Sequence, residues 1–423
     1  MRGLKGGGNT LPRIDCSSLL LGWEGYAVKA VERIEPTANG ERPRVEITLT
    51  RTKPTFRCSG CGRETRDSHE MTVRCVRDLP IFDADTYVWL PRYRVACPAC
   101  GPKVEALPWL SPWARVTQRL AESVVQLCRV LPVQHVAAFY GLTWDTVKTL
   151  DAAALAKQLL PVDLSAVTVI AMDEIALRKG HRYATVVVEP SRKRVLWVGT
   201  GRSREDVQPF FTVLGPEGCR RLEAVVMDMN AAYEEEVRAW CPQAVVVYDL
   251  FHVVAKYGRE VIDRVRVDEA YRVRYDHAAR KVIKGARWLL LRNRENVRKA
   301  EDRVRLQELL HANRRLATVY VLKDDLKHVW HYTYPGAAQR FFNDWYHRAV
   351  RSRIQPLKVF AQKLKAKLDG ILSHCHYPLH TSLLEGINNK IKVIKRMGYG
   401  YRDAGYFFLK IMAAFPGNPD VTG

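Results

Sequence analysis

The chain has 423 residues, of which 47% are hydrophobic and 26% charged, values that fit a globular protein of several domains and exclude wholesale disorder, collagen and a coiled coil. Lysine and arginine total 67 against 45 aspartates and glutamates, and the net charge of +22 predicts a polyanionic partner, either nucleic acid or an anionic membrane. Because the sequence has no run of apolar residues long enough to span a membrane, no apolar core of a signal peptide near its start and only 10 cysteines, we expect a cytoplasmic protein that binds nucleic acid rather than a membrane.

The first expected elements are strands and a zinc module. Residues 1–56 carry short β-branched runs that predict strands and a hairpin. In 57–112 two Cys-x-x-Cys-Gly knuckles follow, separated by 35 residues that an inserted strand pair over 71–95 would fill. Four thiolates complete a tetrahedral structural site for one Zn²⁺, with ligands Cys58, Cys61, Cys97 and Cys100. Unpaired buried cysteines and redox use are the alternatives, and Cys75 is a spare ligand.

The remaining cysteines are interpreted as small buried apolar groups, namely Cys16, Cys128, Cys219, Cys241 and Cys375.

Residues 113–161 predict a helix-turn-helix. Thr117 is placed to cap a first helix, Pro132 to start a second, and Thr143 to cap a third. Gly141 stands where a left-handed turn would join the last two. An ordinary helical hairpin is the alternative, but the basic chain and the neighbouring zinc module favour DNA binding. The exposed side chains expected to contact DNA are Trp144, Asp145, Lys148 and Gln134.

Over 162–254 the pattern is three hairpin strands, then helix, strand, helix, strand, which is the order of an RNase H-like fold. Its first strand ends in Asp173 and Glu174, and its fourth ends in Asp228. In that order the first and fourth strands are neighbours, so the two aspartates would lie side by side. Paired carboxylates repel unless a cation lies between them, which predicts a divalent metal site. The alternative is that these strand ends simply emerge into solvent.

A third acid, Glu385, lies in a last helical region over 381–413. Ser382 and Glu385 also form a capping-box pattern, so an N-terminal helix cap is the plain alternative. Ile387, Ile391 and Ile394 share the core face of this helix. The polar residues on its other faces suit metal and phosphate contacts and are Asn388, Lys392, Lys395 and Arg396.

Three strings resemble bacterial insertion-sequence transposases of the DDE type, and in particular the insertion-sequence L-three family: MDEIALRKGHRYATVVVEP, VVVYDLFHVV and LEGINNKIKVIKRMGYGYRD. The resemblance covers almost the whole chain. It implies a catalytic triad of Asp173, Asp228 and Glu385, with Asp249 and His252 near the active site. The alternative for the last two is a strand-end aspartate and a helix-start histidine. The sequence departs from the pattern at Glu189, where an aspartate is expected.

The interval between Asp228 and Glu385 is long for a bare RNase H-like core, and it implies an all-helical insertion over 255–370 before the last part of the core at 371–423. Within it, residues 256–299 hold 14 basic against 6 acidic side chains, which favours contact with DNA phosphates. Trp288 is either a base-stacking residue or part of the core. A structural role is the favoured reading of a late cluster, His374, Cys375, His376 and His380.

The family likeness implies chemistry on DNA with two Mg²⁺ or Mn²⁺ ions held by the triad, Asp173 bridging both. Hydrolysis would expose a 3′ hydroxyl at the element end, and that hydroxyl would attack target DNA. The zinc and helix-turn-helix modules would hold the terminal inverted repeats, and pairing two ends calls for a homodimer or larger assembly in a bacterial, nucleoid-associated setting. The alternatives are a catalytically inactive DNA-binding regulator and an RNase H-like nuclease without strand transfer.

Overall fold

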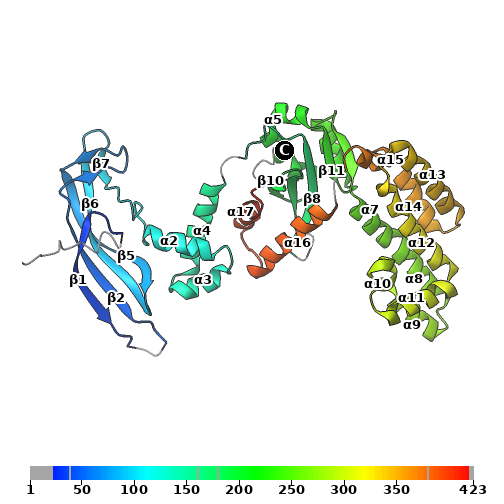
Figure 1. Cartoon of the computed structure of the whole chain (residues 1–423), viewed down its shortest axis with the longest axis horizontal. Helices are drawn as coiled ribbons and strands as arrows, with labels where there is room; N and C mark the ends of the chain where they lie inside the picture. The colour runs from blue at the N-terminus through cyan, green and yellow to red at the C-terminus, as the bar shows by residue number, and fades with distance from the viewer. Residues whose placement is uncertain are drawn as a thin grey trace, which may run out of the picture. The chain divides into compact units, whose positions relative to one another are not determined.

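In the computed structural model (Figure 1), the described parts of the chain are residues 22–37, 40–159, 162–178, 180, 182–378 and 381–418, without the side chains of residues 294, 381 and 382. They fall into two compact units, which are taken in turn. The first runs to Gln158 and includes 397–399, and the second comprises Leu159–Arg396 and the chain from Gly400. Three residues singled out in the sequence, Cys16, Pro161 and His380, lie outside the described residues.

The first unit is built on a sheet of order β1-β2-β6-β5, with β7 paired to β6. Both predictions for this region are confirmed, because β1 and β2 form an antiparallel hairpin and β5 and β6 form the inserted strand pair. Alternating apolar residues of these strands bury one face against Trp23 and Trp109. The strands are β1 (Tyr26–Ile34), β2 (Arg44–Arg51), β3 (Phe56–Arg57), β4 (Glu64–Thr65), β5 (Ser68–Ile81), β6 (Ala84–Cys97) and β7 (Gly101–Val104).

Three helices follow in the same unit: α2 (Gln118–Leu127), α3 (Val133–Tyr140) and α4 (Trp144–Gln158). As predicted, the Thr117 side chain caps α2 and Gly141 ends α3 with φ of 60°. Leu131 lies beyond the end of α2 and is exposed. The buried Asp78 carboxylate of β5 accepts hydrogen bonds from Thr117 (2.6 Å) and Arg119 (2.7 Å), so these helices are tied to the sheet.

The second unit contains a mixed sheet of order β10-β9-β8-β11-β12. Its strands are β8 (Val169–Arg178), β9 (Arg182–Glu189), β10 (Arg194–Thr200), β11 (Ala224–Met227) and β12 (Val245–Tyr248). The first three strands form antiparallel pairs, whereas β11 lies parallel to both β8 and β12. The predicted adjacency of the first and fourth strands is therefore confirmed.

Helices cover both faces of this sheet, which gives three layers. On one face α5 (Arg204–Arg221) and α6 (Ala231–Trp240) pack through residues such as Phe210 and Val237. On the other face α16 (Thr381–Met397) and α17 (Ala404–Ala414) pack through Ile387, Ile391 and Ile411. Figure 1 shows α16 running beside β8. The predicted core stripe of the late helix is confirmed for Ile387 and Ile391, whereas Ile394 is only half-buried.

Between β12 and α16 the chain is helical, as predicted for the insertion. Its elements are α7 (Leu250–Tyr257), η1 (Gly258–Ile262), α8 (Asp263–Arg272), α9 (His277–Gly285), α10 (Arg287–Leu291), η2 (Arg294–Asn296), α11 (Ala300–Ala312), α12 (Arg314–Lys327), η3 (His328–His331), α13 (Pro335–Arg351), α14 (Gln355–Lys365), α15 (Leu368–Leu372) and η4 (Ser373–Cys375). Among the described residues no helix is long and apolar enough to cross a membrane.

One buried lysine organises the centre of the insertion. Lys323 of α12 is 1% exposed, and its Nζ donates to the carbonyl oxygens of Leu290 (3.1 Å) and Arg292 (2.7 Å) at the end of α10. Burial lowers the pKa of Lys323 to about 8. The lysine therefore donates hydrogen bonds to carbonyl oxygens at the end of α10 that have no backbone amide of the helix to accept from.

The insertion leaves and rejoins the core at the same strand. It begins directly after β12, and α15 packs against β12 on its return. Just before α15, Lys367 Nζ donates to Glu234 Oε2 of α6 (2.5 Å) and to the Tyr248 hydroxyl of β12 (3.1 Å). At Gly370 a Cβ would lie 2.5 Å from the Tyr248 ring, so only glycine allows this approach.

Candidate functional site

Three aspartates lie at the same end of three adjacent parallel strands. The pairing of β11 with β8 and β12 places Asp228 between Asp173 and Asp249, each at or just beyond the end of its paired segment. The residues two positions before each aspartate pack in the core that α16 covers. Because side chains alternate across a strand, all three carboxylates lie on the α16 face. The predicted adjacency of Asp173 and Asp228 is confirmed, but the prediction that the first strand ends at Asp173 is wrong, because β8 continues to Arg178 in its pairing with β9.

Backbone amides next to each aspartate fix its orientation. Asp173 Oδ1 accepts from the amide of Glu174 at 2.7 Å, and Asp249 Oδ1 accepts from the amide of Phe251 at 3.0 Å. Asp228 Oδ1 accepts at 3.0 Å from the amide of Asn230, a residue that sequence reasoning missed. The Asp-x-Asn spacing could have indicated this contact, because an aspartate side chain commonly accepts a hydrogen bond from the backbone amide two residues later.

The three carboxylates form a concentrated negative site. Burial raises the pKa of Asp228 and of Asp249, and the charge of Asp173 adds to both shifts. His252 Nε2 lies 3.4 Å from Asp173 Oδ1 and 3.8 Å from Asp249 Oδ2. Burial lowers the pKa of His252, but the Asp173 carboxylate and the other two acids outweigh it, and the net shift is upward. The site therefore favours a cation.

The helix α16 meets this site through Asn388 rather than through Glu385. Asn388 Nδ2 donates to Asp173 Oδ2 at 2.5 Å, and Lys395 Nζ donates to the Ala176 carbonyl at 2.8 Å. Glu385 is exposed, one helical turn before Asn388. In the described part of the chain, only the cysteine cluster has three or more ligand atoms within 4.8 Å of one another. The structure thus brings together Asp173, Asp228, Asp249 and His252, but not the Glu385 carboxylate.

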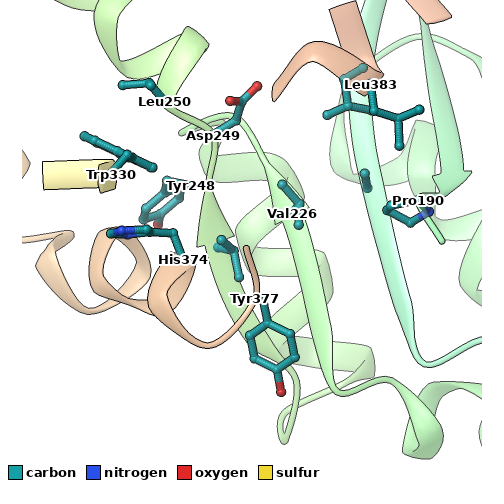
Figure 2. Close-up of a pocket in the computed structure, with 12 residues that line it drawn as sticks. Pro190, Val226, Tyr248, Asp249, Leu250, Trp330, His374, Tyr377 and Leu383 are labelled. Carbon is teal, nitrogen blue, oxygen red and sulfur yellow. The ribbon is translucent and has the colours of Figure 1, made fainter. Parts of the chain in front are cut away.

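A pocket lies beside Asp249 on the same face of the sheet (Figure 2). Its lining includes Trp330, His374 and Leu383, which come from the insertion, from η4 and from the start of α16. His374 Nδ1 lies 2.5 Å from the Ile371 carbonyl oxygen and its Nε2 lies 3.0 Å from that of Tyr332. Both ring nitrogens thus face backbone carbonyls, which supports the structural reading of this cluster.

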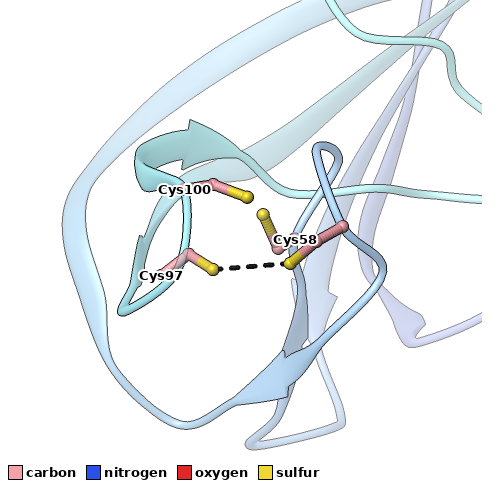
Figure 3. Close-up of side chains that lie close together, drawn as sticks. Cys58, Cys97 and Cys100 are labelled. Atoms are coloured by element: carbon pink, nitrogen blue, oxygen red, sulfur yellow. Dashed lines mark hydrogen bonds between the residues drawn. The ribbon is translucent and has the colours of Figure 1, made fainter.

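The four knuckle cysteines converge in the first unit, with sulfurs within 4.8 Å of one another (Figure 3). Gly62 and Gly101 follow the knuckles with φ of 73° and 67°, so both provide the predicted tight turns. The backbone amide of Ala99 lowers the pKa of the Cys97 thiol to about 7, which favours the thiolate that binds metal. Cys75 lies in β5 opposite Trp89 and is outside the cluster.

Of the cysteines expected to be small buried groups, Cys128, Cys219 and Cys241 are buried, whereas Cys375 is only half-buried and donates to the Tyr332 carbonyl at 3.3 Å.

Some of the side chains predicted to contact DNA are exposed to solvent, and others make hydrogen bonds within the chain. Trp144 is 46% exposed on α4, and Lys148 Nζ lies 5.5 Å from its ring centroid. Trp288 is 67% exposed on α10, so the alternative reading of it as a core residue is wrong. Lys392 and Arg396 of α16 are exposed, while Asn388 and Lys395 make the contacts with β8 described above.

Comparison with known proteins gives matches along most of the chain. A family model for the DDE transposase of ISL3 elements, described as a transposase, matches residues 170–411. A model of the helix-turn-helix domain of transposase family ISL3 matches 105–154, and a model of the zinc finger of IS204/IS1001/IS1096/IS1165 transposases matches 54–100.

Two curated relatives are similar over nearly the same span. The transposase for insertion sequence element IS1001 of Bordetella parapertussis is 54% identical over 398 residues, which cover 94% of this chain and 97% of the relative. The transposase for insertion sequence element IS1557 of Mycobacterium tuberculosis is 27% identical over 393 residues, 87% of each chain. The matched zinc finger, helix-turn-helix and transposase segments follow one another in the order that the sequence predicts.

Proposed function

Because the chain belongs to the ISL3 family of transposases, we propose that Asp173, Asp228 and Glu385 are the catalytic triad of its DDE domain. We further propose that the mixed α/β core is RNase H-like, divided into 162–254 and 371–423 by the helical insertion at 255–370. The observation that carries this proposal is the alignment of Asp173 and Asp228 on adjacent parallel strands, under a helix that also bears Glu385.

The donor set fits a divalent metal. Three carboxylates gathered on one face, with pKa values raised for Asp228 and Asp249, offer only oxygen ligands, and Mg²⁺ and Mn²⁺ prefer these. Asp173, Asp228 and Glu385 would hold two such ions, which activate an attacking oxygen and stabilise the leaving one. The four knuckle cysteines fit one structural Zn²⁺, as their thiolates leave no coordination position open.

The chain's own residues then orient the acids. Asn388 and His252 hold the two oxygens of Asp173, and the amide of Asn230 holds Asp228. In the proposed reaction, hydrolysis of a phosphodiester bond at the element end gives a 3′ hydroxyl. That hydroxyl attacks a target phosphorus, forms a new phosphodiester bond and displaces a target 3′ oxygen.

Recognition of the element ends is assigned to two modules of the first unit. We propose that the zinc module at 57–112, preceded by the β-rich segment 1–56, and the helix-turn-helix at 113–161 bind the terminal inverted repeats. Support comes from the exposure of Trp144 on α4 and from the net charge of +22. Because two ends must be joined, a homodimer or larger assembly on DNA is the proposed active form.

Asp173→Asn tests the triad. With terminal-repeat DNA and Mn²⁺, the cleavage rate of the variant should fall by roughly 10³-fold or more. The reason is that a metal ion bound at this site would stabilise the charge of the transition state by several kcal/mol. Its affinity for the same DNA should stay within about twofold of the wild type, because this residue lies outside the proposed repeat-binding modules. Unchanged cleavage would remove Asp173 from the mechanism.

Strand-transfer products distinguish the transposase from a nuclease of the same fold. Wild-type protein that cuts the ends but never joins them to target DNA would favour the nuclease. Wild-type protein that binds the ends without cutting would favour a regulator.

A further inference from the structure

The last turn of α8 and the segment that joins it to α9 each present a tyrosine to solvent. Tyr271 is 66% exposed and Tyr275 is 82% exposed. The Arg274 guanidinium carbon lies 4.8 Å from the Tyr271 ring centroid and 4.4 Å from that of Tyr275. Two exposed rings with a guanidinium stacked against both contribute little to the core, so their arrangement calls for another explanation.

The charge around this turn favours an anion. Arg274 has no carboxylate within 4.0 Å among the residues that the structure describes. The nearest acids along the chain are engaged elsewhere, because Glu269 accepts from Arg315 (2.6 Å) and Asn313 (2.9 Å), and Asp276 caps α9. The surrounding segment 256–299 is also strongly basic.

We propose that Tyr271, Arg274 and Tyr275 bind unpaired nucleotides of single-stranded DNA. Exposed aromatic rings stack on bases only where those bases are unpaired, whereas duplex DNA would offer its phosphates to the arginine alone. The cluster thus combines stacking rings for a base with a cation for the backbone. This inference rests on the proposed function, in which DNA is cut at the element ends, and it adds that nucleotides beside the cut are unpaired.

The cluster is separate from Trp288. Arg287, next to Trp288, lies 3.4 Å from Asp263 at the start of α8. Tyr271 lies eight residues further along the same helix, a distance of about 12 Å at 1.5 Å per residue. The two aromatic positions would therefore contact different nucleotides.

Binding of the full-length, zinc-loaded protein to labelled oligo(dT) tests the proposal by fluorescence anisotropy. The double variant Tyr271→Ala/Tyr275→Ala should bind oligo(dT) at least about tenfold more weakly, whereas Tyr271→Phe/Tyr275→Phe should stay within about twofold of the wild type. The matched control is Tyr334→Ala, which removes a tyrosine of the insertion that is 67% exposed. Equal loss in the control, or no loss in the double alanine variant, would overturn the assignment.

Photocrosslinking gives a second measurement on the unmodified protein. An oligonucleotide carrying 5-iodouracil should crosslink to Tyr271 or Tyr275, as mapped by mass spectrometry, and crosslinks confined to other residues would refute the proposal. Cleavage of terminal-repeat DNA is measured in parallel. If the protein cleaves terminal-repeat DNA but does not bind single-stranded DNA at these tyrosines, only this inference is refuted. If the wild-type protein binds single-stranded DNA here but never cleaves, only the proposed function is refuted.

Discussion

Replacing Asp228 with asparagine should stabilise the metal-free protein and at the same time weaken its response to Mn²⁺. Asp228 is the central acid of three, and burial together with its neighbours raises its pKa. Asparagine keeps the Oδ1 that accepts from the Asn230 amide, but it removes the charge. Without a cation between them, the three neighbouring carboxylates repel one another and destabilise the folded chain.

The size of the effect follows from strand spacing. Charges on neighbouring strands about 4.8 Å apart repel by about 3 kcal/mol at an effective dielectric constant of about 20. The positive charge of a protonated His252 beside Asp173 and the partial solvent exposure of Asp228 both reduce this repulsion. We therefore expect Asp228→Asn to raise the free energy of unfolding by about 1–3 kcal/mol. For a unit of this size the melting temperature should rise by roughly 2–10 °C.

Thermal unfolding of the full, zinc-loaded chain, measured first without Mg²⁺ or Mn²⁺ and then with Mn²⁺, tests both parts of this prediction. Mn²⁺ should raise the melting temperature of the wild type and have a much smaller effect on Asp228→Asn. The control is Asp268→Asn, which removes an acid of the α8 surface that is paired only loosely with Arg264 at 3.9 Å. A variant that is less stable than the wild type without metal, or that responds fully to Mn²⁺, would refute the reasoning.

Three further predictions concern other parts of the chain. Cys61→Ser should lose zinc and terminal-repeat binding together, as measured by metal analysis and gel shift, whereas Cys75→Ser, outside the cluster, should keep both. Trp288→Ala should change the free energy of unfolding by less than about 0.5 kcal/mol because the ring is exposed, yet lower the affinity for cleaved DNA ends in an anisotropy titration. Because Lys323 has a folded pKa of about 8 and a reference pKa of 10.5, the folded chain binds fewer protons between these values, and its stability should rise with pH in that window. Lys323→Met should abolish that rise of about 3 kcal/mol in urea unfolding, and a parallel rise in the variant would contradict the assignment.

Much of the fold was predictable because its signals are local. Thr117, Gly141 and the glycines of the two knuckles each set the conformation of their own turn, and the structure has them in the expected roles. Contacts between distant segments left no such signal. The bond from Arg119 to Asp78 spans 41 residues, and no periodicity indicates that the helices and the zinc-bearing sheet form one compact unit.

The candidate site shows the same division. Asp173 and Asp228 were predictable as neighbours because each follows a run of apolar residues and the predicted strand order makes those two runs adjacent. The position of Glu385 depends on how far α16 slides and turns against β8, which side-chain packing decides. Asn388, which we predicted to contact DNA, donates to Asp173, and nothing in the helical pattern indicated this contact.

Because the insertion returns to β12, the size of the insertion and the strand register of the core can be considered separately. The chain departs after this strand and returns to it through Lys367 and Gly370, so the two ends of the insertion are held next to one strand of the core. Helices can be lengthened, lost or replaced there without shifting the strand register that aligns the aspartates. We therefore expect that a change in the length of these helices would alter the surface of the insertion and leave the aligned aspartates in place.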